Sequence, residues 1–251
     1  MKKWSLDFGE FKITFREILA SISIIAVMLL IGFVISGKIS QSNIDENEKY
    51  NKAIKIENDK DMFQYGMKTN VGNAFVHGEL KAVDTVTFPE IGGKYMYVKK
   101  VEEHHNRHVK TYTTTDSKGH KHTHTKVYYS WDYAGKETKE CKKLSFCDVK
   151  FSSDKIDIPG TSYIETIKES SRVRFKYYGT GTKSKGTIFV ELKNKTIPDN
   201  SYFYENCDIE NTMDILISKG IGDQIIFWIF WIILTGAAVF GFYYLDNEWL
   251  E

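Results

Sequence analysis

The chain has 251 residues and carries 34 Lys and Arg against 33 Asp and Glu, a formal net charge of +1. A chain so close to neutrality lacks the overall basic character of nucleic-acid-binding proteins, so we expect no nucleic-acid partner. The length is sufficient for one substantial folded domain. The apolar residues are concentrated in two long blocks, which excludes an ordinary soluble pattern for the whole chain.

Residues 1–17 combine basic and aromatic side chains. Several aromatic residues recur at helical spacing, among them Trp4, Phe8 and Phe11. This spacing predicts an amphipathic flank that lies along the cytoplasmic membrane surface. The segment "FKITF" alternates equally well as a β-strand.

Two blocks, 18–37 and 225–245, contain 20 and 21 residues without a charge. A hydrocarbon core of about 30 Å takes about 20 helical residues, so both blocks are predicted to be transmembrane helices. The first block is longer than a typical signal-peptide core and no A-x-A-like site follows it, which favours an uncleaved signal-anchor. The lipid bilayer is therefore the expected surrounding of both helices.

The charges beside the blocks predict the orientation of the chain in the cell membrane. Four basic residues precede the first block: Lys2, Lys3, Lys12 and Arg16. Residues 246–251, after the second block, contain no Lys or Arg. The positive-inside rule then predicts a two-pass protein with both termini in the cytoplasm and residues 38–223 outside it. Lysines that follow the first block weaken this asymmetry: Lys38, Lys49, Lys52 and Lys55.

The spans also contain candidate contact residues. Trp228, Trp231 and Trp249 are placed as interfacial aromatic anchors. Small residues four apart, at Gly32/Ser36 and Ala237/Gly241, allow close helix–helix packing. They make a protein partner, or a homo-oligomer formed through the transmembrane helices, an expected interaction.

Between the spans, residues 38–69 are predicted to form a polar helical stalk, capped by Ser42 or Asp45. Residues 70–223 contain seven or more short runs rich in Val, Ile, Tyr, Phe and Thr, separated by turn residues. Several runs alternate apolar with polar, as antiparallel strands with one buried face do. The predicted class is an α+β membrane protein with two transmembrane helices flanking a mainly antiparallel β domain.

Several strings carry a resemblance: "FVHGELKAVDTVTFPEIGGKYMYVKKVEEHH", "SWDYAGKE", "LSFCDVKF" and the closing "FWIFWIILTGAAVFGFYYLDNEWLE". They resemble uncharacterised two-pass membrane proteins of Gram-positive bacteria and their phages, over most of the chain. The layout of residues 70–190 is more loosely similar to the beside-a-membrane domain of the GIDE family. The chain lacks the RING domain of the eukaryotic ligases in that family, so the resemblance implies no ligase activity.

The three cysteines, Cys141, Cys147 and Cys207, all fall between the spans. An extracytoplasmic position permits a disulfide, and three cysteines leave one over. In "CKKLSFC" the first two share one strand face but lie too far apart along an extended strand to bond directly. Free cysteines packed as small apolar residues are the other possibility.

Six of the seven histidines lie between residues 104 and 131. A hairpin through 116–119, with Thr115 opposite His120, puts His120, His122 and His124 on one strand face. These imidazoles could then converge on a zinc or copper ion, and a shift by one residue would bring His108 to the same face. No carboxylate is interleaved with them, and a polar hairpin needs no metal, so a simple solvated hairpin is the leading interpretation.

No nucleophile elbow, P-loop or H-E-x-x-H motif is present, which predicts a protein without catalytic residues or a required cofactor. The leading functional hypothesis is a non-catalytic two-pass membrane protein whose extracytoplasmic β-rich domain contacts other molecules at the cell envelope; a phage- or prophage-encoded protein is one version of this hypothesis. The alternatives are metal binding or sensing through the histidine hairpin, and a GIDE-like membrane factor that works with a separate catalytic partner.

Overall fold

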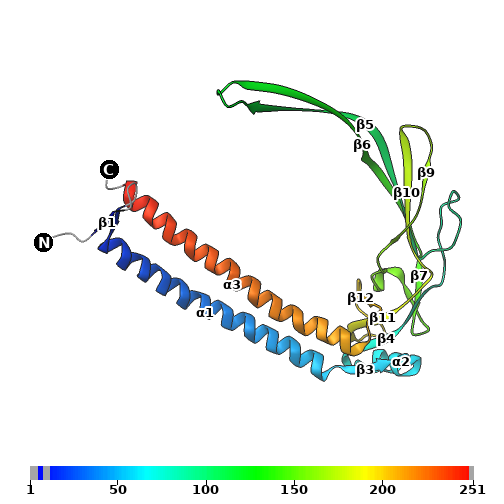
Figure 1. Cartoon of the computed structure of the whole chain (residues 1–251). Coiled ribbons are helices and arrows are strands. Elements are labelled where there is room, and N and C mark those ends of the chain that lie inside the picture. Colours follow the sequence, from blue (N-terminus) through cyan, green and yellow to red (C-terminus); the bar gives the residue numbers. More distant parts are fainter. Residues whose placement is uncertain (1–4, 8–11, 249–251) are drawn as a thin grey trace. The chain divides into compact units, whose positions relative to one another are not determined.

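The computed structural model describes residues 5–7 and 12–248, with the side chains of 14–246, and divides into two compact units (Figure 1). One unit comprises residues 1–52 and 211–251 and contains two long helices. The other comprises residues 53–210 and contains the large β-sheets. The protein is therefore α+β, and its two long apolar helices flank an antiparallel β domain in the sequence, as predicted.

The helices are α1 (Phe15–Lys52) and α3 (Ile209–Glu248). Both are long and apolar enough to cross a membrane, by length and composition. At 1.5 Å per residue the 38 residues of α1 extend about 57 Å, which exceeds the hydrocarbon thickness of about 30 Å. Each helix therefore continues well beyond the apolar block predicted from the sequence.

The predicted stalk over 38–69 is wrong as a separate helix. Residues 38–52 continue α1 without a break, so neither Ser42 nor Asp45 caps a new helix. Strand β3 (Ile54–Glu57) and helix α2 (Lys60–Thr69) follow. Asp59 caps α2 instead, because its side chain accepts a hydrogen bond from the Met62 backbone nitrogen at 2.9 Å.

The start of α1 is defined by a short hairpin and a capping box. Strands β1 (Ser5–Asp7) and β2 (Lys12–Thr14) pair antiparallel, so the strand interpretation of "FKITF" is confirmed over 12–14. The Thr14 backbone nitrogen donates to a Glu17 carboxylate oxygen, and the Glu17 nitrogen donates to the Thr14 hydroxyl at 3.3 Å. Trp4, Phe8, Phe11 and Trp249 lie outside the described residues.

Polar contacts join α1 to α3 along their length. Arg16 forms an ion pair with Asp246 at 2.6 Å near one end of the pair, and the Asn43 amide donates to the Gly220 carbonyl at 2.8 Å near the other. Between them, the Gln224 amide lies 3.3 Å from the Ser36 hydroxyl. These contacts define an antiparallel helical hairpin within one chain.

Aromatic packing completes this hairpin. Trp231 donates from Nε1 to the Met28 carbonyl oxygen at 2.9 Å and occupies the space that Gly32 leaves open. The ring of Trp228 packs edge-on against Phe33, with centroids 5.4 Å apart. Both tryptophans predicted as interfacial anchors therefore contact the neighbouring helix, and Gly32 is a helix-contact position, as its small size predicted.

The larger sheet of the β unit is built around β4 (Gly72–Ala82). β11 (Lys183–Leu192) pairs with one edge of β4, and β12 (Phe203–Glu205) extends the sheet beyond it. The other edge pairs with β3, which is parallel, and with β7 (Lys143–Phe146), followed by β8 (Val149–Ser152). The core on this sheet includes Phe63 and Met67 from α2, since the apolar face of that helix points into it.

The second sheet has the order β6-β5-β10-β9, formed by Lys121–Glu140, Tyr97–Thr115, Val173–Thr180 and Ser162–Lys168. All its pairs are antiparallel. A small core of Phe88, Val98 and Tyr177 supports it. A short 3-10 helix, Ser153–Lys155, follows β8.

Strands β5 and β6 continue far beyond their neighbours. Pairing between β10 and β5 stops at His104, so residues 105–131 form a two-stranded ribbon that is curved and projects from its sheet (Figure 1). Its eleven β5 residues, 105–115, reach about 36 Å at about 3.3 Å per residue. An isolated pair of strands is only marginally stable in water, so this ribbon has little support from its own packing.

Candidate functional site in the β5–β6 ribbon

The tip of the ribbon is a three-residue turn. The Asp116 nitrogen donates to the His120 carbonyl at 2.9 Å, and the Gly119 nitrogen donates to the Asp116 carbonyl at 3.0 Å. Gly119 has a φ of +86°, which glycine adopts without strain and which three-residue hairpin turns require. The predicted register is therefore wrong by one residue: Thr115 lies opposite Lys121 and not His120.

The observed register changes which histidines share a face. His108 lies opposite Tyr128, His124 opposite Tyr112, and His122 opposite Thr114. Directly paired residues project to the same side of a sheet. His108 therefore shares a face with His120, His122 and His124, as the alternative register had predicted.

Asp116 organises the two histidines at the tip. Its Oδ1 accepts hydrogen bonds from the backbone nitrogens of Lys118 at 2.9 Å and His120 at 2.8 Å. Its Oδ2 lies 3.1 Å from Nδ1 of His120 and 3.3 Å from Nε2 of His122. No carboxylate is interleaved with the histidines in the sequence, but Asp116 reaches His120 and His122 across the turn.

The backbone hydrogen bond from His120, with the side-chain contact from His122 and the backbone hydrogen bond from Lys118, holds the pKa of Asp116 below its usual range. A lowered folded pKa means that the carboxylate stabilises the turn above the unfolded pKa of about 3.9. That stabilisation is lost as the pH falls through the folded pKa. We expect the amide proton chemical shifts of Lys118 and His120 to show a transition below about pH 4.

Nuclear magnetic resonance of the full chain checks this expectation, and Asp116→Asn is the control because it removes the titrating group. The variant should show no transition in the same acidic range. Wild-type amide shifts without a transition between about pH 4 and pH 2 would contradict the assigned role of Asp116.

The other two histidines on this face have partners of their own. The ring of His124 stacks on Tyr112 with centroids 5.3 Å apart, and its Nε2 lies 2.8 Å from the Thr114 hydroxyl. The ring of His108 stacks on Tyr128 at 5.1 Å, and its Nε2 lies 2.7 Å from Asp132. Within residues 5–7 and 12–248, no group of three His, Cys, Asp or Glu side chains converges in a way that could hold a metal ion.

The opposite face of the ribbon base carries a stacked row, defined as Arg174, Trp131, His105 and Tyr129. The Arg174 guanidinium lies over the Trp131 ring at 4.2 Å from its centroid. His105 lies 4.9 Å from the Trp131 centroid and 5.6 Å from that of Tyr129. These cation–π and stacking contacts stiffen the point where the ribbon leaves its sheet.

Glu103 anchors the lower end of the stacked row. It accepts hydrogen bonds from Arg174 Nε at 2.6 Å and Lys176 Nζ at 3.0 Å. Burial by itself would raise the pKa of Glu103, but the bonds from Lys176 and Arg174 outweigh burial and lower it. This carboxylate is therefore ionised and already has two cationic partners.

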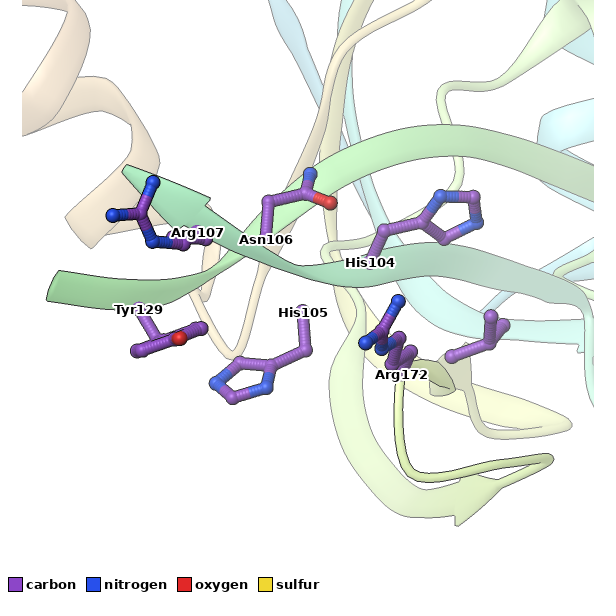
Figure 2. A pocket seen from close by; sticks show the side chains of 7 residues that line it. His104, His105, Asn106, Arg107, Tyr129 and Arg172 are labelled. Carbon is purple, nitrogen blue, oxygen red and sulfur yellow. The ribbon is translucent and has the colours of Figure 1, made fainter. Parts of the chain in front are cut away.

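A groove of about 470 Å³ opens beside the stacked row (Figure 2). His105, Tyr129 and Arg172 lie on one side of the strand pair, and His104 and Asn106 lie on the other. The groove is lined by His104, His105, Asn106, Arg107, Tyr129, Arg172 and Val173. Sequence reasoning missed it, because Arg172 reaches the ribbon only through the pairing of β10 with β5.

The cysteines are free thiols in this structure. The prediction that Cys141 and Cys147 share one strand face is wrong. Cys147 lies in the turn between β7 and β8, with a φ of +47°. Burial raises the pKa of Cys141 to about 11 and that of Cys147 to about 12. Both therefore stay protonated at neutral pH and pack as apolar core residues, whereas Cys207 is partly exposed.

Fold and ribbon together define the class of protein: an antiparallel β domain with a long basic and aromatic ribbon, flanked in the chain by two apolar helices that are long enough to cross a membrane. Comparisons with protein-family models, with curated proteins and with solved structures found no match to this chain.

Proposed function

We propose that this chain is a non-catalytic, two-pass integral membrane protein that holds its β-rich domain outside the cytoplasm as a contact module. The observation that carries the proposal is the distribution of side chains on the helical hairpin, with small and polar residues between the helices and apolar residues on the outside. Its inner surface contains Gly32, Ser36 and Gln224, which contact the opposite helix.

The outer surface of the hairpin is apolar. Large exposed hydrophobic side chains cover both helices, including Ile22, Val27, Leu30, Val34, Ile226, Phe230, Ile232 and Ile233. A soluble protein rarely exposes so large a contiguous apolar patch. Small and polar residues between helices, with apolar residues outside, are the arrangement that packing in lipid favours.

The ion pair of Arg16 with Asp246 supports a topology with both chain ends on one side of the membrane. The basic residues Lys2, Lys3 and Arg16 favour the cytoplasm for that side. The polar contact of Asn43 with Gly220 lies beyond the two apolar blocks, where the helices leave the hydrocarbon core. In this topology residues 53–210 fold outside the cytoplasm.

The ribbon is the proposed contact element of the β unit. Its exposed aromatic side chains include Tyr112, Tyr128 and Tyr129. Five basic residues accompany one carboxylate between residues 104 and 131: Arg107, Lys110, Lys118, Lys121, Lys126 and Asp116. Exposed tyrosines and basic residues along a projecting strand pair favour contact with a negatively charged or polar partner surface.

Cysteine labelling in intact cells tests membrane insertion and topology. Ser117→Cys at the ribbon tip, in a Cys207→Ser background, should react with a membrane-impermeant maleimide, because Cys141 and Cys147 are buried. The matched variant Lys2→Cys should react only after the cells are made permeable. The protein should also require detergent for extraction.

Release of the protein by carbonate without detergent would refute membrane insertion, and the reverse labelling pattern would refute the topology. The Ser117→Cys variant also tests the contact role, because it can carry a photo-crosslinker. Adducts should form from the ribbon tip and not from Asn194→Cys, an exposed turn elsewhere in the β unit. Equal adduct formation from both positions would count against the ribbon as the contact element.

A further inference from the structure

The groove at the base of the ribbon is lined by cations without acidic partners. The chain contains four arginines. Arg16 and Arg174 bind the carboxylates Asp246 and Glu103. Among the described residues, neither Arg107 nor Arg172 forms an ion pair with a carboxylate, and both line this groove. No Asp or Glu is among the residues that line it.

Strand pairing brings these residues to one groove. The His105 nitrogen donates to the Arg172 carbonyl at 2.8 Å, so Arg172 lies opposite His105, which pairs with Trp131 on its other side. Arg107 is two residues further along β5, opposite Tyr129. Arg172 therefore lies diagonally across from Arg107 on the neighbouring segment, and both arginines line the same groove.

The neighbouring acids do not neutralise this face. Glu103 is held by Arg174 and Lys176. Glu102 contacts His104. Asp132 contacts His108, on the opposite face of the ribbon. The two unpaired guanidinium groups therefore give the groove a local positive charge that its surroundings leave uncompensated.

We propose that this groove binds the phosphate group of an anionic ligand, with Arg107 and Arg172 as the charged donors and His105 as a further N–H donor. Arginine suits phosphate because its planar fork donates two parallel hydrogen bonds. The groove is open and its arginines are exposed, so it fits a phosphate presented on a larger molecule better than an enclosed metabolite. A phospholipid headgroup and a soluble phosphate ester share this chemistry.

The faces of the stacked row favour phosphate over nucleobases as the recognised group. His105 lies between Trp131 and Tyr129, and Arg174 covers Trp131. Base stacking needs open aromatic faces, and those of His105 and Trp131 are already occupied. The proposal goes beyond the proposed membrane function and does not depend on it, since the groove lies wholly within the β unit.

Calorimetric titration of the full-length protein with glycerol phosphate tests the site. The protein is held in nanodiscs of phosphatidylcholine, and saturable binding is expected. Arg107→Gln with Arg172→Gln should raise Kd about tenfold or more, since charge-assisted hydrogen bonds are lost. The matched control is Lys110→Gln with Lys126→Gln, which removes the same charge from a directly paired position on the opposite face and should leave Kd within about twofold.

Nanodiscs that also contain phosphatidylglycerol distinguish the two sources. If the lipid headgroup is the ligand, phosphatidylglycerol should compete with glycerol phosphate, and the Arg107/Arg172 variant should abolish the competition. Unchanged binding in those nanodiscs assigns the site to soluble phosphate esters. Absent binding, an equal loss in the lysine control, or tighter binding of an oligonucleotide than of glycerol phosphate would each overturn the proposal. A circular dichroism spectrum confirms that each variant is folded.

Discussion

Replacing Gly32 by leucine should separate α1 from α3 and strongly destabilise the helical hairpin. A Cβ atom at this position would lie 2.5 Å from Nε1 and 2.8 Å from Cδ1 of Trp231. The indole cannot withdraw without losing its hydrogen bond to the Met28 carbonyl. A small residue at a close helix–helix contact cannot be replaced by a large one without loss of packing.

Gly37→Leu is the matched control, because it lies in the same helix and a Cβ there would meet nothing within 4 Å. Disulfide crosslinking between Asn43→Cys and Gly220→Cys, whose side-chain amide and carbonyl lie 2.8 Å apart, reports hairpin formation. Crosslinking should be efficient in the wild-type and Gly37→Leu backgrounds and largely lost with Gly32→Leu. Equal crosslinking in all three backgrounds would contradict the packing of Trp231 on Gly32.

The second large effect is expected in the core of the β unit, at Gly78 on β4. A Cβ atom there would overlap the sulfur of Cys147, which is buried in the turn between β7 and β8. Overpacking of this kind costs about 1–3 kcal/mol, so Gly78→Ala should lower the free energy of unfolding by that amount. Gly135→Ala on β6 is the control, since a Cβ there meets nothing within 4 Å.

A double-mutant cycle makes this prediction specific. Cys147→Ala removes the sulfur and leaves a Cβ at 3.6 Å from the new methyl group, an ordinary contact distance. The pair should therefore be less destabilised than the sum of the single variants, with a coupling of about 1–2 kcal/mol in denaturant unfolding. Additive effects would show that the sulfur of Cys147 is not the reason for a glycine at position 78.

The sequence predicted the features that depend on composition and period. The charge-free blocks at 18–37 and 225–245 lie within helices of the expected kind, and the alternating runs form antiparallel strands. It failed where long-range pairing decides local structure. Residues 54–57 read as part of a polar helix, yet they form β3 because the edge of β4 offers them hydrogen-bond partners.

The site shows the same division. Strand alternation placed His122 and His124 on one face, but the register depended on where the turn closes, which Gly119 and the Asp116 side chain determine. The groove at the ribbon base could not be inferred at all. Arg172 is 67 residues away from His105 in sequence, and only the pairing of β10 with β5 brings the two together.

The contact of Trp231 with Met28 spans 203 residues of sequence, which has a consequence for synthesis. Ribosomes add about 5–20 residues per second, so α1 is complete for about 10–40 s before its partner helix exists. During that interval the space beside Gly32 is not filled by Trp231, and the Ser36 hydroxyl has no contact with the Gln224 amide. The first helix is therefore made long before its partner helix, and the space at Gly32 that Trp231 later fills stays open while the whole β domain is synthesised.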